Sequence, residues 1–555
     1  MRLHDYLDYW GRETPDADLA ILAGRSLSYR EGVERTNRLA NALIDDGLEI
    51  GSRIAVLARN SIEYILLYFA ASKAGVTLVP LNARLGAEEW TGQVRDAGAE
   101  VLFANRAFTP SIDRVRDRVP GIRRFVTLEG SPAGDWETLA DWLARSSPNQ
   151  SARDVDEEAV VYQMYTSGTT GESKGSLITH RALTANLSQI APALGITHGE
   201  RALAVSPMSH ASVVLNTFSV VHAGGTVFIQ PDFDPARVVA LLDEARIAVA
   251  FVVPAILQVF LTAVSDVAKR NYPNLRLMQY GASPITEATL RGAMSAFKCD
   301  FLQIYGMTEA SVALTFLSPS DHQRALAGES HLFHSAGRPA LGTDLRVVDE
   351  FDRSLPTGQL GEIVVRGPQL MRGYWNRPDD TERTLWGGWL HTGDGGTLDA
   401  AGYLYVRDRI KDLIVSGGEK ISARAVEDVL ARHPMVAEVV VIGVPDVLRG
   451  EAVKAIVVPR DGETPSAREL LRHCRLVLGN LRSPRSIEFA STLPRTPSGK
   501  VLKRVLRDPY WAGHPHSIAD GSGGVLRVAG PMAGPNPSPL PDAGRGEQVC
   551  VRQPE

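Results

Sequence analysis

The chain has 555 residues, of which 44% are hydrophobic and 22% are charged, a balance typical of a soluble protein of several domains. Its net charge of −5 creates no strong field for nucleic acid or an anionic membrane, so we expect neither as a partner. Cys299, Cys474 and Cys550 lie far apart, fit no metal-ligand spacing and suit a reducing compartment.

The N-terminus is too polar for the apolar run of a secretory signal. The apolar stretch 64–81 contains a lysine and a glycine and is better explained by a buried helix and a strand than by a membrane span. We therefore expect a cytoplasmic protein without a transmembrane segment.

Short apolar runs alternate with helical segments along the first 350 residues. The pattern predicts a helix over 61–74 and strands over the following ranges: 53–58, 76–81, 202–206, 226–230 and 248–253. Alternation of this kind predicts an α/β architecture with mostly parallel sheets.

The character of the chain changes after residue 360. Ranges 362–366 and 403–407 mix apolar with polar residues, as half-exposed antiparallel strands do. From 409 we expect a compact α+β unit with helices over 422–433 and 466–478 and strands over 436–443 and 452–459. Beyond 511 the chain is rich in Gly, Pro and Ser and is expected to be disordered.

Residues 165–175, Tyr-Thr-Ser-Gly-Thr-Thr-Gly-Glu-Ser-Lys-Gly, form the first chemical motif. Glycines let the backbone N–H groups approach a polyphosphate, hydroxyls add donors, and a lysine adds positive charge. The loop differs from a P-loop, because Ser173 and Gly175 flank the lysine where that motif needs glycine and Ser/Thr. An ordinary flexible turn would explain the glycines but not the lysine. The phosphate-binding candidates are Thr166, Ser167, Gly168, Thr169, Thr170 and Lys174.

Further motifs follow in a fixed order: 305–309 (Tyr-Gly-Met-Thr-Glu), 361–362 (Gly-Glu), 389–394 (Trp-Leu-His-Thr-Gly-Asp), 409–412 (Arg-Ile-Lys-Asp), 416–420 (Ser-Gly-Gly-Glu-Lys) and 494–500 (Pro-Arg-Thr-Pro-Ser-Gly-Lys). Together with the loop at 165–175, they resemble the adenylate-forming superfamily of acyl- and aryl-CoA synthetases, luciferases and nonribosomal peptide adenylation domains. The resemblance covers the chain to about residue 508.

This resemblance implies an α/β fold: a large N-terminal domain of α/β subdomains with a small β-barrel-like region, plus a small mobile α+β C-terminal domain. We expect the AMP-binding domain over 1–408, the mobile domain over 409–510 and a tail over 511–555. The implied reaction has two steps. A carboxylate attacks the α-phosphate of ATP to give acyl-AMP and pyrophosphate, and a thiol, usually that of CoA, then takes the acyl group and releases AMP.

The resemblance also assigns roles to single residues. Lys500 would bridge the carboxylate and the α-phosphate during adenylation, Asp394 and Arg409 would bind the ribose, and Glu309 would bind Mg²⁺. Thr308 would donate to the α-phosphate and act in catalysis. The remaining nucleotide-binding candidates are Gly281, Ala282, Ser283, Gln303, Tyr305, Gly306 and Met307, with Tyr305 along the adenine. Each residue also has a competing explanation. Lys500 could be a surface lysine, Asp394 a turn-forming aspartate and Arg409 part of a surface salt bridge. The other candidates could serve simple packing.

Around residue 410 the resemblance implies a moving joint. Lys411 would be the hinge of the small domain, and the pantetheine channel would be lined by Ser416, Gly417, Gly418 and Lys420. An ordinary interdomain linker is the alternative.

Residues 207–213 resemble the border of the acyl pocket, with His210 at its gate and counted among the catalytic candidates. Ala211 stands where amino-acid-activating relatives carry an aspartate, so a substrate ammonium would stay uncompensated. Val213, Val214 and Leu215 add apolar surface. We therefore expect an apolar carboxylic acid, most readily a fatty acid, with ATP, Mg²⁺ and CoA. A core role for the histidine is the competing explanation.

Several alternatives stay open: an aryl-CoA ligase, an acyl-AMP ligase that loads the phosphopantetheine of a carrier protein, a light-emitting oxidative enzyme, and a non-catalytic homologue. The retained Lys500, Asp394, Arg409 and Glu309 argue against the last. Carrier protein and homodimer also stay open as partners. The pattern departs from the family at Ser173 and Gly395, and neither departure removes a catalytic group.

Overall fold

The computed structural model describes residues 1–130, 134–151, 153–167, 173–409, 413–416, 419–447, 449–495 and 501–512; the side chains of Ser167, Asp408, Arg409, Val415, Glu419, Lys420 and Leu481 lie outside that description. Within these ranges no helix is both long and apolar enough to cross a membrane.

Sheet A has a parallel middle and antiparallel edges. Its strands run in the order β16 (Arg338–Pro339), β15 (Val312–Leu317), β14 (Asp300–Met307), β13 (Leu277–Gly281), β12 (Ile247–Val252), β10 (Arg201–Ala204), β11 (Thr226–Ile229), β1 (Asp18–Leu22) and β2 (Arg25–Ser28). The carboxyl ends of β13 and β14 therefore meet at one edge, in the register Gly281↔Ile304.

Sheet B is also mainly parallel, with an antiparallel hairpin and a short strand at one side. Its order is β19 (Gly373–Tyr374), β9 (Ser173–Thr179), β8 (Val160–Ser167), β4 (Thr77–Leu81), β3 (Arg53–Leu57), β5 (Val101–Ala104), β6 (Arg124–Thr127) and β7 (Glu137–Thr138).

Helices cover both faces of each of these two sheets, and the helices between the sheets share one core with them. The shared core contains residues of α1 (Leu3–Glu13), α2 (Tyr29–Asp45), α3 (Ile62–Ala74), α6 (Leu139–Arg145), α7 (His180–Leu194) and α8 (Ala211–His222). On the other face of sheet B lie α4 (Ala87–Ala97) and α5 (Thr109–Asp113). On the other face of sheet A lie α9 (Pro235–Glu244), α10 (Pro254–Ala263), α11 (Glu287–Phe297) and α12 (Pro319–Leu326).

Helix α3 shows how local sequence sets an element in the middle layer. The Ser61 side chain accepts the backbone N–H of Tyr64 at its start, and Gly75, with φ 71°, ends it in the left-handed region. Almost every residue between them is buried, because the helix is covered on all sides. These end signals explain why the predicted range 61–74 agrees with the structure.

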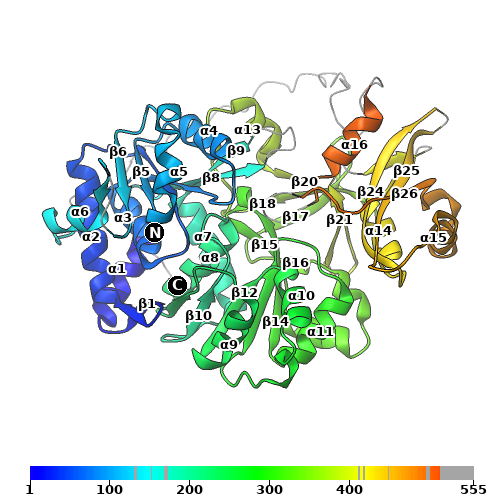
Figure 1. Ribbon diagram of the computed structural model, residues 1–555, viewed down its shortest axis with the longest axis horizontal. Helices are drawn as coiled ribbons and strands as arrows, with labels where there is room; N and C mark the ends of the chain where they lie inside the picture. The colour runs from blue at the N-terminus through cyan, green and yellow to red at the C-terminus, as the bar shows by residue number, and fades with distance from the viewer. Residues whose placement is uncertain are drawn as a thin grey trace, which may run out of the picture.

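Two smaller sheets follow. Sheet C is antiparallel, with β17 (Asp344–Val348), β18 (Gly361–Arg366), β20 (Leu390–Leu398) and β21 (Leu404–Arg409); α13 (Pro378–Thr384) precedes β20. Sheet D contains β23 (Glu419–Ile421), β22 (Ile414–Ser416), β25 (Gly450–Pro459), β24 (Val436–Asp446) and β26 (Ser486–Phe489), with α14 (Ala423–Ala431), α15 (Ala467–Arg482) and α16 (Lys503–Trp511). Figure 1 shows sheet D and its helices at one end of the molecule, with sheet C between them and sheets A and B.

This architecture confirms the predicted fold class: a large α/β portion, a small antiparallel sheet and a small α+β unit. Segment ends differ in detail. Strand β24 runs to Asp446, beyond the predicted end at 443, because its pairing with β25 continues to Gly450. The limits 1–408, 409–510 and 511–555 stay predictions, and residues 513–555 lie outside the described chain.

Candidate functional site

The candidate phosphate loop connects β8 and β9 of sheet B. The two strands pair in the register Thr166↔Lys174 and Ser167↔Ser173, so the hairpin ends at these residues. Gly168, Thr169 and Thr170 lie outside the described residues. Thr166 and Lys174 therefore stand on opposite strands at the loop end of the hairpin.

Glu309 connects this hairpin with sheet A. It lies in the short 3-10 helix Thr308–Ala310 after β14, and its side chain is buried. Its Oε1 accepts hydrogen bonds from the Tyr374 hydroxyl at 2.8 Å and from the Thr166 hydroxyl at 3.3 Å. Burial and the nearby Glu309 carboxylate both raise the pKa of Tyr374, so its hydroxyl stays a donor. One carboxylate thus receives donors from β8 and β19.

Lys174 is paired in a way that the sequence did not predict. Its Nζ lies 2.9 Å from Oδ1 of Asp380 in α13 and 5.4 Å from the centre of the Tyr374 ring. Burial alone would raise the pKa of Asp380, but hydrogen bonds from Lys174 and Arg383 outweigh it and lower this pKa. The Asp380 carboxylate therefore occupies at least one of the three donors that Lys174 would offer a phosphate.

Asp394 lies in sheet C and reaches toward sheet A. Its Oδ2 accepts a hydrogen bond from the Tyr305 hydroxyl at 2.7 Å. Residues 392–394, for which a turn-forming aspartate is the competing explanation, belong to strand β20, where Gly393 at φ 68° leaves only a local kink. Asp394 pairs with Arg409 in the β20–β21 register. The structure thus brings these two ribose candidates together at the backbone.

The predicted adenine-binding segments depend on two glycines at the edge of sheet A. A Cβ on Gly281 would lie 2.2 Å from the carbonyl oxygen of Ile304, and one on Gly306 would lie 1.5 Å from that of Val312. Neither position accepts a larger residue without moving the backbone. The backbones of neighbouring strands therefore approach each other closely at these two positions.

The other nucleotide candidates lie beside these glycines. Ala282 has φ 65° and, like Ser283, is exposed. Gln303 accepts a hydrogen bond from the Tyr280 hydroxyl at 3.2 Å. Met307 ends β14, and Thr308 opens the 3-10 helix that carries Glu309. Ala282 and Ser283 follow the carboxyl end of β13, and Met307 and Thr308 lie at that of β14, whereas Gln303 lies in the middle of β14.

His210 is the residue before α8, and the loop that leads to it is held by Asn60. The Asn60 amide donates to the Ser206 carbonyl at 2.7 Å and accepts from the Met208 N–H at 2.8 Å. The Tyr68 hydroxyl donates to the Met208 carbonyl at 3.0 Å. Burial, and then the charge of Arg84, lower the pKa of His210, so its ring is neutral at physiological pH.

Asn60, Tyr68, Tyr374 and Asp380 are the positioning residues that sequence reasoning missed. Each acts on a partner far along the chain, and no local motif marks such a pairing. The only visible signal was the aromatic pair after Gly373.

Several predicted residues cannot be placed in the site. Lys411, Gly417, Gly418 and Lys500 lie outside the described residues, as do the side chains of Ser167, Arg409 and Lys420. Ser416 is described and is buried at the end of β22.

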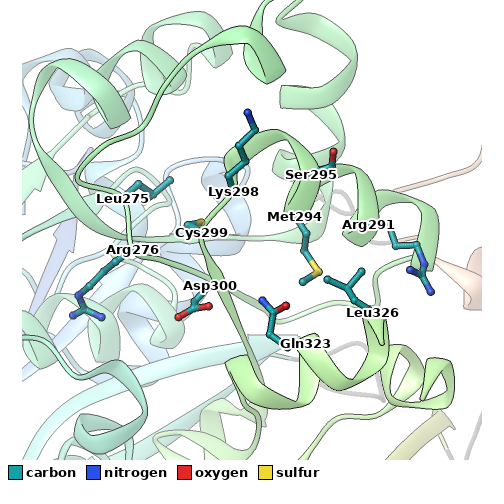
Figure 2. Close-up of a pocket in the computed structure, with 10 residues that line it drawn as sticks. All are labelled: Leu275, Arg276, Arg291, Met294, Ser295, Lys298, Cys299, Asp300, Gln323 and Leu326. Atoms are coloured by element: carbon teal, nitrogen blue, oxygen red, sulfur yellow. The ribbon is translucent and has the colours of Figure 1, made fainter. Parts of the chain in front are cut away.

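Two further observations delimit the site. Among the described residues, no three His, Cys, Asp or Glu side chains gather as a metal cluster. A single carboxylate such as Glu309 nevertheless fits Mg²⁺, which takes one or two carboxylates plus phosphate oxygens and water. A cavity of about 580 Å³ lies at the opposite, amino-terminal edge of sheet A, between α11, α12 and the start of β14 (Figure 2). Its arginines, Arg276 and Arg291, are paired with Glu200 and Glu287.

Two family profiles match this chain, one over its larger N-terminal part and one over its C-terminal part. The profile described as AMP-binding enzyme matches residues 7–375, and that of the AMP-binding enzyme C-terminal domain matches 425–500. The chain is 37% identical to the fatty acid–[acyl-carrier-protein] ligase ScoC of Streptomyces coeruleorubidus, over 91% of this chain and 95% of that one. It is 36% identical to a feruloyl-CoA synthase of an Amycolatopsis species, over 89% and 96%. Its structure is similar to that of a Mycobacterium tuberculosis fatty acyl CoA synthetase, with a TM-score of 0.74, 31% identity and coverage of 93% and 99%.

Proposed function

The chain belongs to the AMP-binding enzyme family of AMP-forming acid–thiol ligases, and we propose that it converts an apolar carboxylic acid, ATP and CoA into acyl-CoA, AMP and pyrophosphate. The observation that carries this proposal is the convergence of three sheets. Thr166 and Tyr374 of sheet B meet Glu309 at the end of sheet A, while Tyr305 of sheet A meets Asp394 of sheet C.

Adenylation needs donors and positive charge where the carboxylate attacks the α-phosphate. Lys174 and Thr166 stand at the loop end of the hairpin, and Thr308 directly precedes Glu309, whose carboxylate accepts from Thr166. We assign Lys500 the approach to both the carboxylate and the α-phosphate. The 494–500 motif supports this assignment, because a glycine- and proline-flanked loop can insert a lysine.

We assign recognition of the nucleotide to residues at the edge between sheets A and C. The carboxylate of Asp394 can accept from both ribose hydroxyls, and Arg409 pairs with it across β20–β21. We assign the adenine a surface at the strand ends near Gly281 and Gly306, where the strand backbones approach each other closely. Tyr305 closes this surface while its hydroxyl donates to Asp394.

Mg²⁺ would be held by Glu309, whose carboxylate faces the end of the phosphate hairpin through Thr166. When bound, the ion supplies positive charge to the phosphates of ATP. The Tyr374 hydroxyl orients the carboxylate for that contact.

The thioester step is assigned to the segment after sheet C. Ser416, Gly417, Gly418 and Lys420 would line the pantetheine arm, and Lys411 would be the hinge that exchanges the Lys500 loop for this channel. Residues at the end of an element commonly absorb such rotations, and the hinge follows directly on strand β21. We place the enzyme in the cytoplasm, because the free Cys299 and Cys474 suit a reducing compartment.

The test combines a panel of acids with three readouts: pyrophosphate release, AMP formation and thioester formation, each with and without CoA. Pyrophosphate release without any CoA-dependent product would overturn the CoA assignment. Lys500→Ala should abolish adenylation and largely spare thioester formation from supplied acyl-AMP. Lys269→Ala, an exposed lysine in another part of the chain, is the matched control and should change neither step.

A second acceptor is favoured by one finding, the 37% identity to a fatty acid–[acyl-carrier-protein] ligase. In this alternative the acyl group passes to the phosphopantetheine of a carrier protein. Parallel assays with CoA and with a phosphopantetheine-bearing carrier protein decide between the acceptors: a kcat/KM larger by tenfold or more for one of them identifies it.

A further inference from the structure

A small cavity lies between α8 and sheet A, on the face of the sheet that looks toward the shared core. One face of α8 lines it through Val213, Asn216, Thr217 and Val220, and β10, β12 and β13 line it from the sheet side. Its volume is about 20 Å³, the room of about one water molecule. Most of its lining is aliphatic, so polar groups in it stand out.

Three side-chain oxygens of this lining accept or donate no hydrogen bond within the described chain: Asn216 Oδ1, Thr217 Oγ1 and Gln279 Oε1. Thr217 is 3% exposed and Gln279 is 2% exposed. The Asn216 amide donates to the Ser212 carbonyl at 2.7 Å, and this bond fixes Oδ1 as the free acceptor. By contrast, the Ser219 hydroxyl on the same helix donates to the Leu215 carbonyl.

Buried polar atoms without a partner are rare because each is destabilising. Three of them around one small cavity, from a helix and from a strand, therefore indicate a group that binds between them. Two are carbonyl-type acceptors and the third is a hydroxyl that can accept or donate. The matching group is a small hydrogen-bond donor.

The cavity lies in line with the candidate acid site. His210 precedes α8, and Asn216 and Thr217 lie six and seven residues further, about 9 and about 10.5 Å along the helix axis at 1.5 Å per residue. Gln279 points to the same side of β13 as Gly281, two residues before the candidate adenine segment. An acid whose carboxylate is near His210 can therefore reach the cavity with its far end.

We propose that the acid substrate carries a hydroxyl group remote from its carboxylate, and that Asn216, Thr217 and Gln279 recognise it. This inference rests on the proposed function for the location of the carboxylate. The expected substrate is then a hydroxylated acid and no longer a plain alkyl or aryl acid. The three side chains are specificity determinants, because they select the substrate without taking part in bond making.

The test uses two matched pairs of acids: 3-(4-hydroxyphenyl)propenoic against 3-phenylpropenoic acid, and 8-hydroxyoctanoic against octanoic acid. Pyrophosphate release gives kcat/KM for each. We expect a preference of at least about tenfold for the hydroxylated member of one pair, because a site built for a hydroxyl rejects the analogue that lacks it. Thr217→Val and Gln279→Met should reduce this ratio at least about fivefold. Ser219→Ala removes a hydroxyl from the same helix outside the cavity and should leave the ratio unchanged.

A second readout separates this inference from the proposed function. The shift in melting temperature produced by each acid alone reports binding without turnover. Selective stabilisation by a hydroxylated acid, without pyrophosphate release, would overturn the proposed function and show that the cavity still binds a hydroxyl. Equal kcat/KM and equal shifts within both pairs would overturn the inference. An unchanged ratio in both variants would also overturn it and leave the cavity as a water site.

Discussion

The ion pair between Lys174 and Asp380 makes a prediction about ATP affinity. In this structure the ammonium lies 2.9 Å from the carboxylate, and the two side chains are 14% and 19% exposed. If Lys174 binds a phosphate of ATP, the Asp380 carboxylate competes with that phosphate for the ammonium. Asp380→Asn keeps the shape of the side chain and removes the competing charge. We therefore expect the variant to bind ATP more tightly.

The size of the effect follows from the pair itself. A partly exposed ion pair contributes about 1 kcal/mol, and 1.36 kcal/mol corresponds to a tenfold change in affinity. Arg383 also contacts Asp380, so the carboxylate keeps a partner when Lys174 leaves, and this lowers the cost of exchange. The expected dissociation constant for Mg·ATP is about threefold to fivefold lower in Asp380→Asn.

Isothermal titration with Mg·ATP measures this constant without an acid substrate. Asp379→Asn removes an exposed carboxylate from the same helix and is the matched control. Lys174→Met should weaken binding in both backgrounds. An unchanged or higher dissociation constant in Asp380→Asn relative to Asp379→Asn would refute the idea that Asp380 competes with phosphate for Lys174.

Three further predictions concern stability and backbone fit. Asn60→Ala leaves two backbone groups of the loop 206–208 unpaired and should lower the free energy of unfolding in urea by about 2–5 kcal/mol. A loss below 1 kcal/mol would contradict the idea that Asn60 holds this loop. Gly306→Ala places a Cβ 1.5 Å from the Val312 carbonyl oxygen and should abolish Mg·ATP binding in titration, whereas retained affinity would show that this edge does not hold the nucleotide. Burial lowers the pKa of His4 from 6.5 to about 4, so its neutral form stabilises the fold above pH 6.5 and this contribution falls as pH drops toward 4. Between pH 7 and 5 His4 should contribute a loss of about 2 kcal/mol, measured in urea unfolding as the difference between the wild-type protein and His4→Asn.

Much of the fold could be predicted because its signals are local. Helix α3 begins after a capping serine and ends at a glycine, and both lie within the segment itself. The Asp394 segment shows the limit of this reasoning. A Thr-Gly-Asp sequence is typical of a turn, yet its pairing with β18 and β21 keeps it in a strand. Cross-strand partners are set by the sheet and override the local preference.

The positioning residues could not be predicted for a related reason. Tyr374 contacts Glu309 across 65 residues, and Asn60 contacts Met208 across 148. The residues next to either partner in the sequence do not indicate which distant residue it contacts. The predicted site residues were found through motifs that carry chemistry, whereas the residues that hold those motifs in place become visible only when the sheets are assembled.

The two carboxylates of the site have a second role that follows from this assembly. Glu309 accepts a tyrosine hydroxyl from sheet B, and Asp394 accepts one from sheet A, so each carboxylate joins two sheets. A carboxylate has room for further donors, and both can therefore keep these bonds while binding a ligand. Replacing either by its amide would remove the charge and retain the acceptor oxygen. Stability should then change less than nucleotide affinity, and that difference separates the binding role of each carboxylate from its role between the sheets.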